Sequence, residues 1–112
     1  MDRIPEGEPP FTTSMRLLGG KHKILILWMI SSHGSMRFND LRRLTGDGSS
    51  RMLTIALREL EADGLIVRRV LRESPPWVEY SLTSVGMSVI PVLEELDSWG
   101  AAYQDMVRSR GP

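Results

Sequence analysis

The sequence predicts a mainly helical domain with one small β-hairpin, an α+β fold class. Three features predict this fold. Apolar residues recur at helical spacing in several segments, Asp63-Gly64 ends the central one, and residues 65–71 and 77–82 then show the β-branched and alternating patterns of strands. A chain of 112 residues suits one domain with a modest core.

The first apolar segments predict two helices. Residues 12–18 are expected to form a short helix that Gly19-Gly20 stops. Residues 21–31 contain ILILWMI, which is apolar on every side and would also suit a buried strand. We favour a central buried helix, because its leucines, tryptophan and methionine tolerate a helix well and its length approaches three turns.

A helix-turn-helix is predicted next. After a turn at residues 31–34 and a short extended piece at 35–37, residues 38–44 place Phe38, Leu41 and Leu44 on one helical face. The segment GDGSS, residues 46–50, is a turn rich in helix-capping residues. Two short helices joined by such a turn form the skeleton of a helix-turn-helix.

The second helix of this pair has two different sides. Its apolar residues fall within about 100° of arc, and Gly64 is well placed as its left-handed stop. These apolar residues are Leu53, Ala56, Leu57 and Leu60. The opposite side carries Arg51, Thr54, Ile55 and Arg58.

A hairpin and a last helix complete the domain. Strands are expected at 65–71 and 77–82, and residues 72–76 between them are expected to be irregular because Pro75-Pro76 lacks amide donors. Such a hairpin with a rigid tip is a wing, so the fold is a winged helix-turn-helix. Thr83 is a plausible N-cap for a final helix, which Pro91 should bend or restart.

Charge distribution singles out the middle of the chain. The totals balance, with 14 basic and 14 acidic side chains, but residues 37–72 carry eight arginines against five acidic residues. The absence of cysteine excludes disulfides, thiolate metal sites, cysteine nucleophiles and thiol redox sensing. His22 and His33 do not fill a typical metal site alone, so we expect no metal, no cofactor and no catalytic residues.

No segment predicts a membrane span or a signal peptide. The longest apolar run, residues 24–30, is far too short to cross a bilayer. Residues 1–10 are acidic and proline-rich, without the cationic and apolar regions of a signal peptide. We expect a soluble cytoplasmic protein with a flexible arm at residues 1–10.

The outward side of the second helix is the candidate DNA-binding site, because the major groove of DNA admits a helix. Its arginines can pair with guanine or grip phosphate, Ile55 can meet a thymine methyl, and free amides at the helix start favour a phosphate. Lys21 and Lys23 are either phosphate contacts or solvated. The alternative for the arginines is a merely solvated helix face. The predicted DNA-facing set is Ser49, Ser50, Arg51, Thr54, Ile55, Arg58, Arg42, Arg69 and Arg72.

The wing offers further cations. Strand alternation places Arg68 and Arg69 on opposite faces, so both cannot reach one groove directly. The alternative is that one of them is solvated and the other pairs with Glu79 on the facing strand. Trp77 at the base of the wing is expected to serve packing.

The last helix predicts a homodimer. Its apolar stripe continues so far past the small domain that the protein's own core is not expected to cover it, and an exposed apolar stripe usually marks an interface. The alternative is that the helix folds back over its own domain. The predicted interface comprises Val89, Leu93, Leu96, Trp99, Tyr103 and Met106.

In this order, these segments resemble the HxlR-type winged helix-turn-helix regulators, which are relatives of the MarR-like repressors. The resemblance covers approximately residues 17–99. It rests on GGKHKILILWMI, GSMRFNDLRR, SSRMLTIALRELEADGLIVRRV, PPWVEYSLT and VIPVLEEL.

The resemblance implies a dimeric bacterial transcription factor. Its second helix-turn-helix helix, here residues 49–63, would enter the major groove of a near-palindromic operator, and its wing would touch flanking DNA. Carried over by position, the DNA-facing residues would be Ser49, Ser50, Arg51, Thr54 and Arg58, assisted by Arg72.

The sequence departs from this family in four places. His22 replaces a common tryptophan, and residues 46–49 replace a PGIS-like turn, which should leave the turn looser. The cysteine with which many members sense oxidants is absent. Trp77 stands where the family often has arginine, which removes one expected phosphate contact.

These observations predict a sequence-specific regulator of transcription that binds double-stranded DNA and is not an enzyme. We expect an arm at 1–10, a winged helix-turn-helix domain at 11–83 and a dimerisation helix region of the same domain at 84–112. Space lined by Trp28, Met29 and Trp99 is a candidate site for a small apolar effector. The alternative function is a winged-helix module that binds protein and not DNA.

Overall fold

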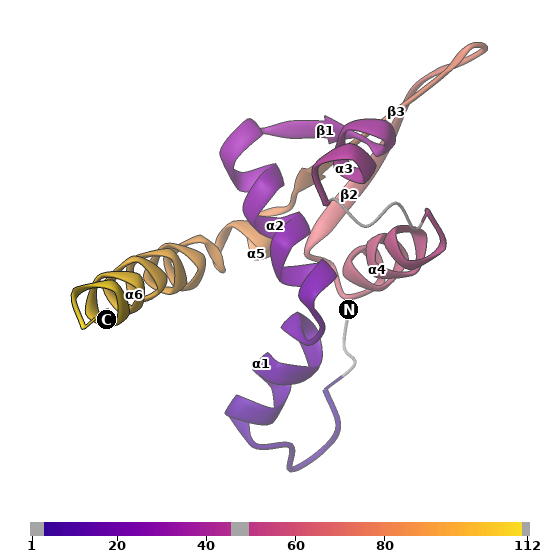
Figure 1. The fold of residues 1–112 in the computed structure, drawn as a ribbon. Helices are drawn as coiled ribbons and strands as arrows, with labels where there is room; N and C mark the ends of the chain where they lie inside the picture. Colours follow the sequence, from indigo (N-terminus) through magenta and orange to yellow (C-terminus); the bar gives the residue numbers. More distant parts are fainter. Residues whose placement is uncertain (1–3, 46–49, 111–112) are drawn as a thin grey trace.

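The computed structural model describes residues 4–45 and 50–110 and confirms the predicted fold class (Figure 1). Helices dominate, and three short strands form one antiparallel sheet. In chain order the elements are α1 Pro10–Leu18, α2 Lys21–His33, β1 Ser35–Arg37, α3 Phe38–Thr45, α4 Ser50–Ala62, β2 Ile66–Glu73, β3 Pro76–Leu82, α5 Ser84–Met87 and α6 Ile90–Ser109.

Helix α2 forms the centre of the core, as predicted, and is a helix and not a strand. Ile26, Leu27 and Ile30 are fully buried, and α2 contacts α3, α4, α6 and the sheet. The turn after α2 uses Gly34, whose φ of 89° suits glycine. His33 lies in this last turn, where its Nδ1 is 2.8 Å from the Met29 carbonyl oxygen, so it has an ordinary structural role.

Helices α3 and α4 pack on α2 through their apolar sides. On α4 the four predicted residues Leu53, Ala56, Leu57 and Leu60 are all buried. Gly64 ends the helix with a φ of 77°, and the Leu65 amide donates to the Leu60 carbonyl at 3.0 Å. On α3, Leu41 is buried and Phe38 packs against the core, but Leu44, which was predicted to share their helical face, is exposed.

The sheet has the order β1-β3-β2, so β3 is central. Tyr80 on β3 pairs with Met36 on β1 and with Arg68 on β2. Its ring and Met36 are buried against the helices. Beyond these residues β2 and β3 continue as a two-stranded hairpin that projects from the body (Figure 1).

Several boundaries differ from the sequence prediction. Helix α2 continues to His33, through most of the turn that was predicted at residues 31–34. Helix α1 begins at Pro10 and not at residue 12, because proline is well tolerated in the first turn of a helix. The hairpin tip is more regular than predicted, since Glu73 pairs with Pro76 and only two residues form the turn. Proline is tolerated at the first residue of a strand. The predicted turn at residues 46–49 lies outside the described residues.

The C-terminal region restarts at the predicted place. The Thr83 hydroxyl caps α5, accepting from the Gly86 amide at 3.0 Å and donating to the Gly64 carbonyl at 2.5 Å. Helix α6 then begins at Ile90 with Pro91 in its first turn. The prediction that Pro91 bends or restarts the helix is therefore confirmed.

The protomer is more extended than a compact domain of its size. Its radius of gyration is 16.0 Å, whereas about 13 Å is typical of a compact chain of this length. Figure 1 shows why: α1, α6 and the hairpin leave the body in three different directions. Helix α6 does not fold back over its own domain, which excludes the alternative drawn from the sequence.

Glu8 joins the N-terminal segment to α1. Its carboxylate accepts from the Thr13 hydroxyl at 2.6 Å and from Arg16 Nη2 at 2.9 Å. The hydrogen bonds from Arg16 and then Thr13 hold the pKa of Glu8 below its usual value of 4.5. The flexibility of residues 1–10 stays a prediction.

Candidate nucleic-acid interface

Helix α4 presents a polar side that its own domain does not cover. Arg51 and Arg58 are exposed on this side, two turns apart, and Ile55 between them is 41% exposed. Thr54 is half-buried, and its hydroxyl donates to the Ser50 carbonyl oxygen at 2.7 Å. The four leucine and alanine side chains on the opposite side anchor the helix, so the outward side is held in a fixed direction.

The two α4 arginines are free to bind a partner. Neither Arg51 nor Arg58 forms a hydrogen bond or an ion pair with any residue in the described part of the chain. Each guanidinium therefore keeps its full set of donors, which match the edge of guanine or a phosphate. A merely solvated helix face would have the same geometry. The groups around the outward side of α4 therefore distinguish a DNA-binding surface from a solvated one.

The start of α4 adds polar groups. Ser50 is exposed, and its hydroxyl lies 3.5 Å from Nη1 of Arg42 on α3. Ser50 and Arg42, both predicted to face DNA, are thus brought together at the N-terminus of α4, where free amides favour a phosphate. Ser49, which was predicted to join them, lies outside the described residues.

A groove separates α4 from the hairpin, with a volume of about 450 Å³. Thr54 and Arg58 line it from α4, and Arg68 lines it from β2. Sequence alternation correctly placed Arg68 and Arg69 on opposite faces, because Arg68 pairs with Tyr80 and Arg69 with Glu79. Of these two arginines, Arg68 lies on the face of the sheet next to α4. Arg68 was not among the predicted DNA-facing residues.

The outer face of the sheet carries the remaining arginines. Arg69 and Arg72 are both exposed there, and the Arg72 guanidinium carbon lies 5.3 Å from the centre of the Trp77 ring. Glu79 on the same face accepts from Trp77 Nε1 at 2.8 Å and from the Ser35 hydroxyl at 3.0 Å. No arginine of the described chain forms an ion pair with Glu79, so the alternative pairing proposed from the sequence is wrong.

Lys23 is not available for phosphate. Its ammonium group lies 3.5 Å from the Glu59 carboxylate on α4, and its side chain is largely buried. This ion pair joins α2 to α4. Lys23 therefore has a structural role, and both alternatives drawn from the sequence, a phosphate contact and a solvated side chain, are wrong.

The predicted dimer residues divide into two groups. Leu93 is 3% exposed within the protomer's own core, and Val89 packs against that core, so both are covered before any partner binds. Leu96, Trp99, Tyr103 and Met106 are exposed along α6. Among these, Trp99 and Tyr103 stack on each other with ring centres 5.5 Å apart. No residue of α1 is buried, and Phe11 and Met15 on it are exposed as well.

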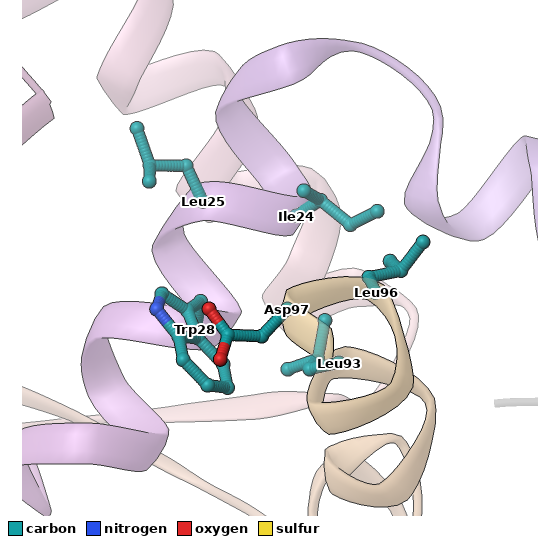
Figure 2. A pocket seen from close by; sticks show the side chains of 6 residues that line it. All are labelled: Ile24, Leu25, Trp28, Leu93, Leu96 and Asp97. Carbon is teal, nitrogen blue, oxygen red and sulfur yellow. The ribbon is translucent and has the colours of Figure 1, made fainter. Parts of the chain in front are cut away.

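A small cavity of about 210 Å³ lies between α2 and α6 (Figure 2). Trp28 lines it, as predicted for an effector site, but Met29 is buried in the core and Trp99 does not line the cavity. Figure 2 shows the Asp97 carboxylate extending from α6 toward Trp28. The lining residues are Ile24, Leu25, Trp28, Leu93, Leu96 and Asp97.

The described residues hold neither a cluster of metal ligands nor a membrane-spanning helix. Residues 4–45 and 50–110 contain no group of three or more histidine or acidic side chains arranged to hold a metal ion. No helix in this part of the chain combines the length and apolar character needed to span a bilayer.

Helices α3 and α4, the three-stranded sheet and the projecting hairpin define a winged helix-turn-helix protein. A family model described as HxlR-like helix-turn-helix matches residues 17–108. The HTH-type transcriptional regulator YdeP of Bacillus subtilis (strain 168) is 43% identical over 98 residues, covering 88% of this chain and 76% of YdeP. The HTH-type regulator YybR of the same organism is 43% identical over 101 residues, covering 89% and 79%.

Solved structures agree with these sequence relatives. The redox regulator HypR in its reduced form is 39% identical, with a TM-score of 0.83 over 90% of this chain and 99% of HypR. The HTH-type regulator YtcD is 40% identical, with a TM-score of 0.81 over 88% and 99% of the two chains. The chain belongs to the HxlR-like helix-turn-helix family, and it is a DNA-binding transcriptional regulator.

Proposed function

We propose that this protein is a homodimer that binds a near-palindromic operator in double-stranded DNA. Helix α4 enters the major groove of each half-site, and the hairpin contacts the flanking backbone. Arg51, Arg58 and Ile55 contact base edges, whereas Ser50 and Arg42 contact phosphate at the start of the helix. Arg68, Arg69 and Arg72 add cations on the hairpin. Phosphate contacts supply most of the affinity and make it salt-dependent.

The single observation that carries this proposal is the pair of unpartnered arginines on α4. Their guanidinium groups project from a helix whose other side is anchored by Leu53, Leu57 and Leu60. Because the helix is anchored on its other side, it presents both guanidinium groups in one direction, and their free donors match the edge of guanine. The neighbouring groove with Arg68 extends the positive surface toward the hairpin.

The exposed side of α6 supports the homodimer. This helix has 20 residues, of which only Leu93 is buried. In proteins, most of the stability of a helix comes from the packing of its apolar side. The apolar side chains of Leu96, Trp99, Tyr103 and Met106 therefore need a cover, and a second copy offers the same stripe in return.

Selection of bound fragments from random DNA, followed by sequencing, tests the function. We expect an inverted repeat whose half-site centres lie about 10 base pairs apart or a multiple of this, since two α4 helices must meet successive turns of the duplex. Light scattering of the DNA-free protein at micromolar concentration should give twice the 12.6 kDa chain mass. Recovery of no shared sequence at low salt would contradict the proposal.

The cavity between α2 and α6 is our candidate effector site. Its volume of about 210 Å³ suits a small aromatic molecule, and the Asp97 carboxylate favours a ligand with a cationic or hydrogen-bond-donating group. A ligand there would contact both the core helix α2 and the dimerisation helix α6. HypR is named as a redox regulator, but the present sequence has no cysteine, so its response would not use thiol oxidation. Thermal-shift screening with small aromatic amines tests the site, and the absence of any stabilising ligand counts against it.

A further inference from the structure

A cluster of two arginines and one tryptophan lies near the hairpin tip. The guanidinium carbon of Arg37 is 4.4 Å from the centre of the Trp77 ring, and that of Arg72 is 5.3 Å from the same ring. We propose that Trp77 orders Arg37 and Arg72 as a binding site for DNA backbone phosphate on the flank of the operator. This inference rests on the proposed function and adds a contact residue, Arg37, and a positioning residue, Trp77.

The strand register explains how the cluster forms. Arg37 on β1 pairs with Glu79, and Trp77 lies two residues before Glu79 on the same face of β3. On β2 a register shift lies between Val70 and Arg72, and it places Arg72 opposite Trp77. Without this bulge Leu71 would occupy that position. The irregularity thus aims a cation, and not a leucine, at the indole ring.

Hydrogen bonds fix the ring and occupy both oxygens of the neighbouring carboxylate. Trp77 Nε1 donates to Glu79 at 2.8 Å, and the Ser35 hydroxyl donates to the other carboxylate oxygen at 3.0 Å. Glu79 is the cross-strand partner of Arg37, yet it forms no ion pair with that arginine. The outer face therefore presents Arg37, Arg69 and Arg72 against one carboxylate that is already engaged.

The arginines keep most of their donors for an anion. Arg37 Nη2 donates to the Pro76 carbonyl at 3.5 Å, and Arg72 Nε donates to the Pro75 carbonyl at 3.4 Å. These contacts use one of the five N–H groups of each guanidinium. A guanidinium held over a ring by a cation–π contact loses less conformational entropy on binding, and its remaining edge matches a phosphate.

DNA backbone is the occupant that fits this position. The site carries excess positive charge, and the hairpin projects on the same side of the view in Figure 1 as α4, whereas α6 leaves on the other side. A duplex held by α4 in its major groove therefore passes the hairpin with its flanking phosphates. Although Trp77 removes a cation expected from the family resemblance, it organises two others.

Binding to two duplexes tests the inference, one limited to the selected operator and one extended by flanking DNA on both sides. The wild type should bind the extended duplex more tightly than the short one. In Trp77→Ala the ratio of these two affinities should fall roughly tenfold, counting both wings of the dimer. Trp77→Phe should retain part of the gain, because it keeps a ring but loses the N–H donor. Arg37→Ala should lower the slope of log affinity against log salt by about 0.9 for each phosphate that the variant no longer neutralises.

Arg108→Ala provides the matched control, because it removes the same charge from the exposed far end of α6. It should leave the flank-dependent gain and the salt slope at wild-type values. If Trp77→Ala does not fold, the comparison of Arg37→Ala with Arg108→Ala still decides. Wild-type gain and slope in both Trp77→Ala and Arg37→Ala would overturn this inference alone, whereas a wild type that binds neither duplex would overturn the proposed function as well.

Discussion

Replacing Leu96 by alanine should weaken the homodimer by a predictable amount. Leu96 is 47% exposed in the protomer and lies on the α6 stripe. The substitution removes three carbon atoms, which contribute about 2.4 kcal/mol when fully buried, at about 0.8 kcal/mol each. Roughly half of this is gained on dimerisation, so the loss is about 1 kcal/mol per protomer and about 2 kcal/mol per dimer. The dimer Kd should therefore rise about 30-fold.

Leu71→Ala is the matched control, because Leu71 is also exposed, at 56%, but lies on the hairpin away from α6. Sedimentation equilibrium over a dilution series measures both dissociation constants. The control should dimerise as the wild type does. A Leu96→Ala protein whose Kd stays within about twofold of wild type, or a Leu71→Ala protein that is weakened equally, would refute the assignment of α6 as the interface.

Three further changes test the fold. Gly86→Ala would place a Cβ 2.0 Å from the Leu65 carbonyl oxygen, so the backbone must shift. Thermal denaturation should show that the free energy of unfolding falls by about 1–3 kcal/mol. An unchanged melting temperature would contradict this packing. Thr83→Val removes the cap of α5 and the bond to Gly64, and should lower the free energy of unfolding by about 1–2 kcal/mol. Thr83→Ser keeps the hydroxyl and should restore most of this loss. Equal melting temperatures for both variants would argue against the cap. Because folding lowers the pKa of Glu8, its stabilising contribution is present above its usual pKa of 4.5 and is lost as the pH falls through the lower folded value. Glu8→Gln should therefore have a lower melting temperature than the wild type at pH 7, and the two melting temperatures should converge at acid pH. A difference that grows on acidification would contradict the Glu8–Arg16 contact.

Local patterns were enough to predict most elements of the fold. The apolar side of α4 and its Gly64 stop follow from spacing and from the conformational freedom of glycine, and both are confirmed. The restart at Pro91 follows from the missing amide donor. These features depend on residues close in sequence, so tertiary packing had little opportunity to override them.

Features that depend on contacts between distant segments were not predictable in the same way. Leu44 matched the apolar side of α3, but the fold leaves it exposed. Leu93 belongs to the predicted dimer stripe, yet α2 packs close enough to bury it within the protomer. A charge pair at Glu79 was one alternative drawn from the sequence, whereas Ser35 and Trp77 are the residues that bond to that carboxylate.

The candidate site was predictable in outline. Amphipathic spacing identified Arg51 and Arg58 as the outward cations of α4, and the structure leaves both without a partner in the described chain. Alternation correctly separated Arg68 from Arg69, but it could not indicate which face lies beside α4. The position of Arg37 beside Trp77 depends on the register of β1 on β3, and that of Arg72 depends on a bulge in β2; no sequence pattern indicates either.

Comparison of Arg51→Ala with Arg69→Ala tests the central claim most directly. Equilibrium binding of each variant is measured, at one salt concentration, on the selected operator and on a random duplex. Arg51→Ala should lose about 1–3 kcal/mol on the operator and little on random DNA, because it removes a base contact. Arg69→Ala should weaken both duplexes alike, because it removes a phosphate contact. Equal losses on operator and random DNA for both variants would contradict base recognition by α4.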